Sequence, residues 1–157
     1  MKTRELQILW WDWLSTSERL LHSLHEQTAA LTLRDVQRVE RLQPELEKLL
    51  ARMKDIDDRA VACAKGLAEE LGAEPSLRGL VRVLDKAEAQ QVQAMANRVT
   101  IAARNVEAVL AKNHKLIENE MHHIHGTLTL VAKAANEAEG PYARKKGSAA
   151  VLIDEAA

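Results

Sequence analysis

The sequence is poor in the residues that interrupt helices or fill mixed cores. Its 157 residues include three prolines, no phenylalanine, one tyrosine and one cysteine. Alanine, leucine, glutamate, lysine and arginine dominate instead, a composition typical of long helices. A single cysteine cannot form an intrachain disulfide, which fits a reducing compartment. We expect Cys63 to be a small buried apolar residue rather than a reactive thiol.

An excess of charge of one sign is also absent, because 22 basic residues are balanced by 23 acidic ones. Binding to phosphates needs an excess of cations on one face, so nucleic acid is not the expected partner. The apolar residues 8–14 are too few to cross a membrane and are interrupted by Asp12. We therefore expect a cytoplasmic protein that is not inserted in a membrane.

Catalytic motifs are missing as well. The chain has no glycine-rich phosphate loop, no nucleophile–base spacing and no pair of acidic residues in a loop. The basic residues 144–146 are too few to anchor the chain to nucleic acid or membrane and are interpreted as solvated charge. We therefore expect no enzymatic activity and no cofactor.

Histidine is the residue type whose placement suggests metal chemistry. Glu120 and His123 have the Glu-x-x-His spacing of metal sites in helical bundles, but a di-metal site needs that motif twice. At about 100° per residue, Glu120 and His123 fall to one side of the apolar stripe of their helix, and His125 and Glu118 to the other. The candidate ligands are therefore His122, His125 and Glu118, yet we expect solvated or boundary histidines and no metal.

The strongest positive signal is an apolar stripe at alternating three- and four-residue spacing. Side chains spaced in this way lie on one narrow face of a helix, which is the face that packs on another helix. A strand would show a period of two. The stripe consists of Val39, Leu42, Leu46, Leu49, Met53, Ile56, Ala60, Cys63 and Leu67.

The sequence predicts an all-α fold, an antiparallel bundle of three long helices with coiled-coil-like packing plus a short crossing helix. We place the helices at about residues 4–31, 33–71, 76–84 and 86–139, within a bundle of residues 1–140. Thr32 and Asp35 resemble a capping box for the second helix, and Pro44 should kink or restart that helix. Gly72 ends it in the usual glycine position.

A second capping box, formed by Asp85 and Glu88, begins the last helix, and Gly140 with Pro141 closes it. At about 1.5 Å per residue, this helix spans about 80 Å and the second helix about 58 Å. The last helix should therefore extend beyond the hairpin by roughly 20 Å, or about fifteen residues. Its apolar stripe continues there without a partner, through Ile117, Met121, Ile124, Leu128, Val131 and Ala135.

Three further features do not fit a plain bundle core. Residues 141–157 no longer follow the helical pattern, and we expect a weakly ordered tail whose apolar residues 151–153 either fold onto the stripe or attract a partner.

Trp10 and Trp13 share the core side of their helix, so Trp11 should be half exposed, as in an interface. Asn113 replaces an apolar residue in a stripe, where a polar side chain can fix the register of packing.

The order of these elements resembles the FlgN-type flagellar export chaperones. The resemblance rests on the turn at residues 31–36, the element Asn113-His114-Lys115-Leu116-Ile117-Glu118, and Tyr142 followed by Gly147. It covers nearly the whole chain in helix order and length. The sequence departs from the family at Leu110, where members often have asparagine, and in the histidine-rich stretch after Ile117.

The resemblance implies a cytosolic, non-enzymatic chaperone of flagellar type III export. Such proteins bind the C-terminal helices of the hook-associated (hook–filament junction) proteins, prevent premature assembly and deliver them to the export apparatus. Family contacts to the clients lie near the C-terminus, which agrees with the unpartnered stripe. The expected client-binding residues are therefore Ile124, Leu128, Val131, Ala135, Val151, Leu152 and Ile153.

Two alternatives share these features. A sister flagellar chaperone would differ only in its client. A self-associating coiled-coil scaffold, a homo-oligomer, would pair the overhanging stripes of two copies, and sedimentation at micromolar concentration would separate it from a monomeric chaperone.

Overall fold

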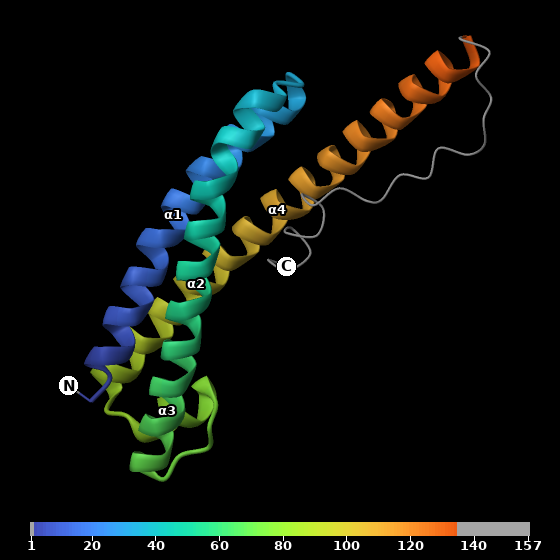
Figure 1. Cartoon of the computed structure of the whole chain (residues 1–157). Coiled ribbons are helices and arrows are strands. Elements are labelled where there is room, and N and C mark those ends of the chain that lie inside the picture. The colour runs from blue at the N-terminus through green and yellow to red at the C-terminus, as the bar shows by residue number, and fades with distance from the viewer. Residues whose placement is uncertain (1, 135–157) are drawn as a thin grey trace.

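The computed structural model of the chain describes residues 2–134, apart from the side chains of Ile124, Leu128, Val131 and Ala134. This part of the chain consists of helices α1 Arg4–Thr32, α2 Val36–Leu71, α3 Leu77–Val83 and α4 Lys86–Ala134, and contains no strand (Figure 1). The predicted fold class, three long helices and a short one, is confirmed. The predicted helix end at residue 139 and the tail 141–157 lie outside the described residues.

The long helices run up, down and up. α1 and α2 form an antiparallel hairpin, and α4 returns along α1 in the same direction (Figure 1). Thr3 contacts Glu88 near the start of both helices and Thr28 contacts Asn113 further along, each pair 85 residues apart. The register between α1 and α4 is therefore constant over this length. The short α3 contacts both α2 and α4 at the base of the hairpin.

The apolar stripe of α2 is the face that the helix buries. Six of its residues are buried, three are half-buried and none is exposed. The buried members are Leu46, Leu49, Met53, Ile56, Ala60 and Leu67. Because burying a large apolar side chain is worth about 1.5–3 kcal/mol, this one face supplies much of the stability of the hairpin.

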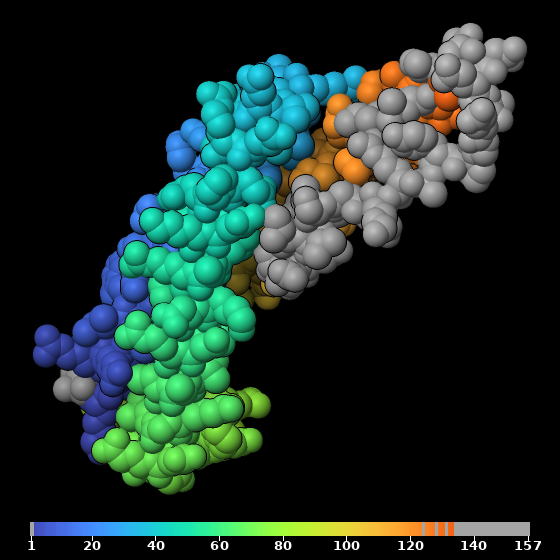
Figure 2. Space-filling view, viewed as in Figure 1, coloured from blue at the N-terminus to red at the C-terminus, as the bar shows by residue number. Residues whose placement is uncertain are grey.

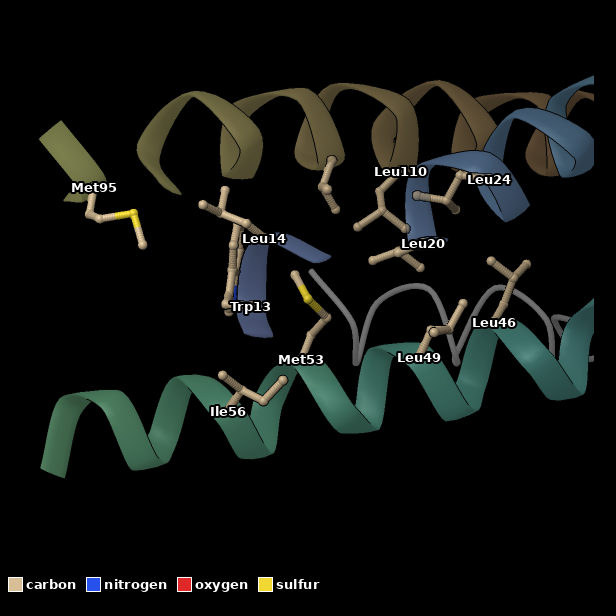
Figure 3. Close-up of a cluster of buried hydrophobic side chains, with 11 residues drawn as sticks. Trp13, Leu14, Leu20, Leu24, Leu46, Leu49, Met53, Ile56, Met95 and Leu110 are labelled. Carbon is tan, nitrogen blue, oxygen red and sulfur yellow. The ribbon is translucent and has the colours of Figure 1, made fainter. Parts of the chain in front are cut away.

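The main core cluster joins all three long helices. Figure 3 shows Leu46, Leu49, Met53 and Ile56 of α2 pointing toward the side chains of α1 and α4. The contributions of the other two helices are Trp13, Leu14, Leu20 and Leu24 from α1, and Met95, Val106 and Leu110 from α4. The core therefore extends along the hairpin as a seam, and its α4 side ends near Ile117, which is 7% exposed.

The turn between α1 and α2 differs from the predicted capping box. Thr32 still belongs to α1, and its hydroxyl donates to the carbonyl of Thr28, at 2.8 Å. Asp35 alone caps α2, since its carboxylate accepts from the backbone N–H of Arg38, at 3.1 Å. The prediction that Thr32 takes part in the cap was wrong, because Arg34 reverses the chain with a positive φ of 55° and so leaves Thr32 inside α1.

Two further local signals, Pro44 and Gly72, concern the course and the end of α2. α2 continues through Pro44 as one helix, so the proline does not restart it. Gly72 ends α2 with a φ of 65°, and the next residue, Ala73, donates to the carbonyl of Ala68, at 2.8 Å. This pairing is a Schellman motif, in which glycine avoids the cost of the left-handed conformation.

The start of α4 is joined to the start of α1 by a buried carboxylate. Asp85 caps α4 by accepting from Glu88 N–H, at 2.9 Å, as predicted. Glu88 does not complete the capping box, because its Oε1 instead accepts from the N–H and the hydroxyl of Thr3, at 2.7 and 2.6 Å. Glu88 is 5% exposed. One negative charge therefore lies at the N-terminal ends of two parallel helices, where helix dipoles favour it.

A second polar layer crosses the same interface near its other end. Asn113 is fully buried, and its Nδ2 donates to the carbonyl of Leu24 and to Oε1 of Gln27, both at 2.9 Å. The hydroxyl of Thr28 lies 2.6 Å from Asn113 Oδ1. Asn113 thus satisfies polar groups of α1 at one position along the helix.

Replacing Glu88 with alanine is expected to lower the free energy of unfolding by about 1–3 kcal/mol. The substitution leaves the N–H and hydroxyl of Thr3 buried without their acceptor. Urea unfolding followed by circular dichroism measures the change. Glu107→Ala, an exposed position on the same helix, is the control. Equal stabilities of the two variants would contradict a bond between the helix starts.

Replacing Asn113 with leucine is expected to cost a similar amount, about 1–3 kcal/mol, although leucine is more apolar. The reason is that the side chains of Gln27 and Thr28 remain and lose their partner. The matched control is Asn105→Leu at an exposed site of α4. Thermal unfolding of both variants checks this expectation, and an Asn113→Leu protein as stable as the wild type would refute it.

Candidate functional site: the distal part of the longest helix

The C-terminal part of α4 extends beyond the hairpin on which the helix packs. Among the described side chains of α4, Ile117 is the last that is buried. Arg34, in the hairpin turn, contacts Glu120 and His123, and α4 then continues to Ala134. Residues 124–134 therefore project past the turn by about 16 Å at the usual helical rise. We call residues 118–134 the α4 arm.

The figures show this geometry directly. In Figure 1 the orange end of α4 stands apart from the α1–α2 turn and points away from it. Figure 2 shows α1 and α2 closely packed along their length, with the orange part of α4 emerging beside the turn. The length mismatch inferred from the sequence is therefore present in the fold. The expectation that the stripe lacks a partner from Ile117 onward was wrong at its start, because the bundle still buries Ile117 and half-buries Met121.

The expected client-binding residues fall mainly on the arm and beyond it. Ile124, Leu128 and Val131 are helical positions of the arm, but their side chains lie outside the described part of the structure. At three- and four-residue spacing, their backbone positions continue the helix face that carries Ile117. The remaining candidates lie outside the described residues, namely Ala135, Val151, Leu152 and Ile153.

The family-motif residues mark the point where α4 leaves the core. Asn113 is fully buried, Leu116 is half-buried and Ile117 is buried. More than three turns after Ile117, Leu130 is 68% exposed, and at about 100° per residue it points away from the face of Ile117. The arm therefore begins directly after a well-packed segment of the same helix.

The candidate metal ligands are not brought together. His122 and His125 are exposed, and Glu118 Oε1 lies 3.2 Å from Nε2 of His114, one turn earlier on the same helix. His123 is occupied by Arg34. Within residues 2–134, no three His, Cys, Asp or Glu side chains are grouped so that they could hold a metal ion.

The three neighbouring tryptophans have the exposures that the sequence predicts. Trp13 is buried, Trp10 is half-buried between two core clusters, and Trp11 is 51% exposed. The guanidinium of Arg98 on α4 lies over the Trp11 ring, with Cζ 4.6 Å from the ring centroid. This cation–π contact ties α1 to α4 at their outer edge, and the interface role of Trp11 remains a prediction.

Cys63 is half-buried beside the small cluster of Leu6, Leu9 and Ala60. Desolvation, and to a lesser extent the negative charge of Glu5, raise the pKa of its thiol above the ordinary value. At neutral pH the thiol is therefore protonated and a poor nucleophile.

Sequence reasoning missed Arg34, through which the hairpin turn contacts Glu120 and His123 of the arm. Its partners on α4 lie far away in the sequence, with His123 89 residues further on. A single arginine in a turn gives no local signal of such a contact, so only the fold could reveal it.

No described helix contains a stretch that is both long and apolar enough to cross a membrane. Neither the curated proteins nor the solved structures gave a significant match to the chain. The family model described as FlgN protein, in contrast, matches residues 1–149 of the 157. This match covers the hairpin, α3 and the whole of the described α4. The chain therefore belongs to the FlgN family, a family of flagellar export chaperones.

Proposed function

We propose that this protein is a cytoplasmic chaperone that binds the C-terminal helices of hook-associated proteins through the α4 arm. It keeps these clients from assembling early and delivers them to the type III export apparatus. The observation that carries the proposal is the arm itself, which extends past the hairpin turn and has an apolar stripe in its sequence. Family membership supports the export role.

The mechanism is recognition of one amphipathic helix by another. A client helix with apolar residues three and four positions apart covers the stripe of Ile124, Leu128, Val131 and Ala135, so that both apolar faces leave water. The arm then covers the face of the client helix that would otherwise pair with the client's own assembly partners. No covalent chemistry and no cofactor are needed for this function.

The tail supplies the additional area that the complex requires. One buried apolar side chain is worth about 1.5–3 kcal/mol, and association and ordering offset much of the gain from four of them. A stable complex therefore needs more buried surface than the arm provides. Val151, Leu152 and Ile153 add it by packing on the client or beside it.

Asn113 sets where the arm begins. Its bonds to Leu24 and Gln27 are satisfied at one axial position of α4 against α1. A shift by one turn would bury these polar groups without partners, which is costly. We assign to Asn113, followed by Leu116 and Ile117, the role of fixing the register, so that the stripe after them always lies beyond the hairpin.

Binding should be abolished by two acidic residues in the stripe. Leu128→Asp combined with Val131→Asp is expected to weaken the binding of a purified C-terminal segment of a hook-associated protein at least 100-fold, because about 3–6 kcal/mol of apolar burial is lost. Isothermal titration calorimetry gives the affinities. Circular dichroism of the free variant verifies that the helices persist.

The control places the same two charges away from the stripe. Thr129→Asp combined with Leu130→Asp changes exposed positions of the same arm, and its affinity should stay within about threefold of the wild type, as is usual for surface changes. Equal binding by the stripe variant and the control would show that the client is bound elsewhere.

A further inference from the structure

Both helices of the hairpin end in a Schellman motif, because Asp35 N–H donates to the carbonyl of Ala30, at 2.9 Å, as Ala73 does to Ala68. The residue in the left-handed position differs between the two. At the end of α2 the left-handed position is Gly72, with a φ of 65°. At the end of α1 it is Arg34, with a φ of 55°, and among the described residues no other non-glycine residue has a positive φ. Bulky side chains seldom adopt this conformation, because Cβ approaches the backbone too closely. A backbone outlier of this kind is a reason to look for a role of the side chain.

The Arg34 side chain has two partners on the α4 arm. Its Nε lies 3.2 Å from Oε2 of Glu120, and its Nη1 lies 3.1 Å from Nε2 of His123. A guanidinium can only donate, so His123 accepts through an unprotonated Nε2. Glu120 and His123 are three residues apart on one face of α4. A single arginine therefore holds two successive points of the arm, and we call this contact the Arg34 bridge.

The bridge lies where apolar packing stops. Ile117 is the last buried residue among the described side chains of α4, and Glu120 follows within one turn. In addition, the two apolar residues that flank the bridge in the hairpin turn do not hold the arm, since Leu33 is 72% exposed and Val36 is 55% exposed. Met121, next to Glu120, is half-buried, and the described side chains of α4 after it are exposed. The last contact that the described residues make between the hairpin turn and α4 is therefore the polar one at Glu120 and His123.

We propose that Arg34 is a positioning residue, which fixes the direction of the α4 arm relative to the hairpin and thereby presents the client-binding stripe in one orientation. Only the second part of this inference, the presentation of the stripe to a client, rests on the proposed function. An arm that is already oriented loses less freedom when a helix binds to it, so part of the cost of association is removed beforehand. Without the bridge, the same stripe is present but samples several directions.

Spin labels measure the direction of the arm without any client. In a Cys63→Ala background, labels are attached to cysteines that replace Gln37 near the turn and Lys133 near the end of the arm, both exposed. The distance distribution of the otherwise unchanged protein should be narrow. Arg34→Ala should broaden or shift it, whereas Arg41→Ala, which removes an exposed charge of α2, should leave it unchanged.

Two further variants separate the side chain from the backbone. Arg34→Gly removes the bridge but suits the left-handed backbone, so the protein should stay folded and yet show the broad distribution. Arg34→Glu combined with Glu120→Arg should restore a narrow distribution that Arg34→Glu alone loses. A narrow, unshifted distribution in Arg34→Gly would overturn the proposal, as would failure of the charge exchange to restore order.

Titration with the C-terminal segment of a hook-associated protein then tests the link to binding. Loss of one partly exposed ion pair should weaken binding by about two- to fivefold in Arg34→Gly, with recovery in the charge-exchange variant. Unchanged affinity of Arg34→Gly would overturn the link. If the unchanged protein does not bind the segment, the proposed function fails, and the distance distributions still decide whether Arg34 orients the arm.

Discussion

The apolar seam shared by α1, α2 and the first part of α4 is the interaction on which the rest of the structure depends. Its residues recur every three or four positions along α2, and they meet the leucines and Trp13 of α1 in one continuous cluster. Since helices of this length gain most of their stability from tertiary packing, the seam decides that the hairpin forms. It also decides how far α4 can be buried, because an apolar face is buried only where the hairpin is present to cover it.

Polar contacts add what apolar packing cannot supply, namely a defined position along the seam. Apolar side chains pack almost equally well after small shifts, whereas a buried hydrogen-bonding group has few satisfactory positions. Glu88 fixes the start of α4 against Thr3, and Asn113 fixes a point 25 residues later against Gln27 and Leu24. With Arg34 at the turn, polar contacts are spaced along the whole interface between α4 and the hairpin.

The structural consequence is a division of α4 into two parts with different surroundings. The first part is a structural element of the bundle, and the arm after Ile117 is a helix with its own apolar stripe and little hairpin beside it. In the function proposed here, one amphipathic helix of a client takes the place of the missing bundle partner along the arm.

The sequence by itself determined the helices, the buried face of α2, the end at Gly72, the cap at Asp85 and the mismatch between helix lengths. These features follow from local rules, since periodicity, caps and rise per residue depend on neighbours within about one turn. Only the tertiary structure decided that Glu88 bonds to Thr3 instead of completing its own cap, that Arg34 rather than Thr32 shapes the turn, and that Arg34 holds the arm. The partners in these contacts are 85 to 89 residues apart, and a charged side chain carries no local sign of which distant group it will meet.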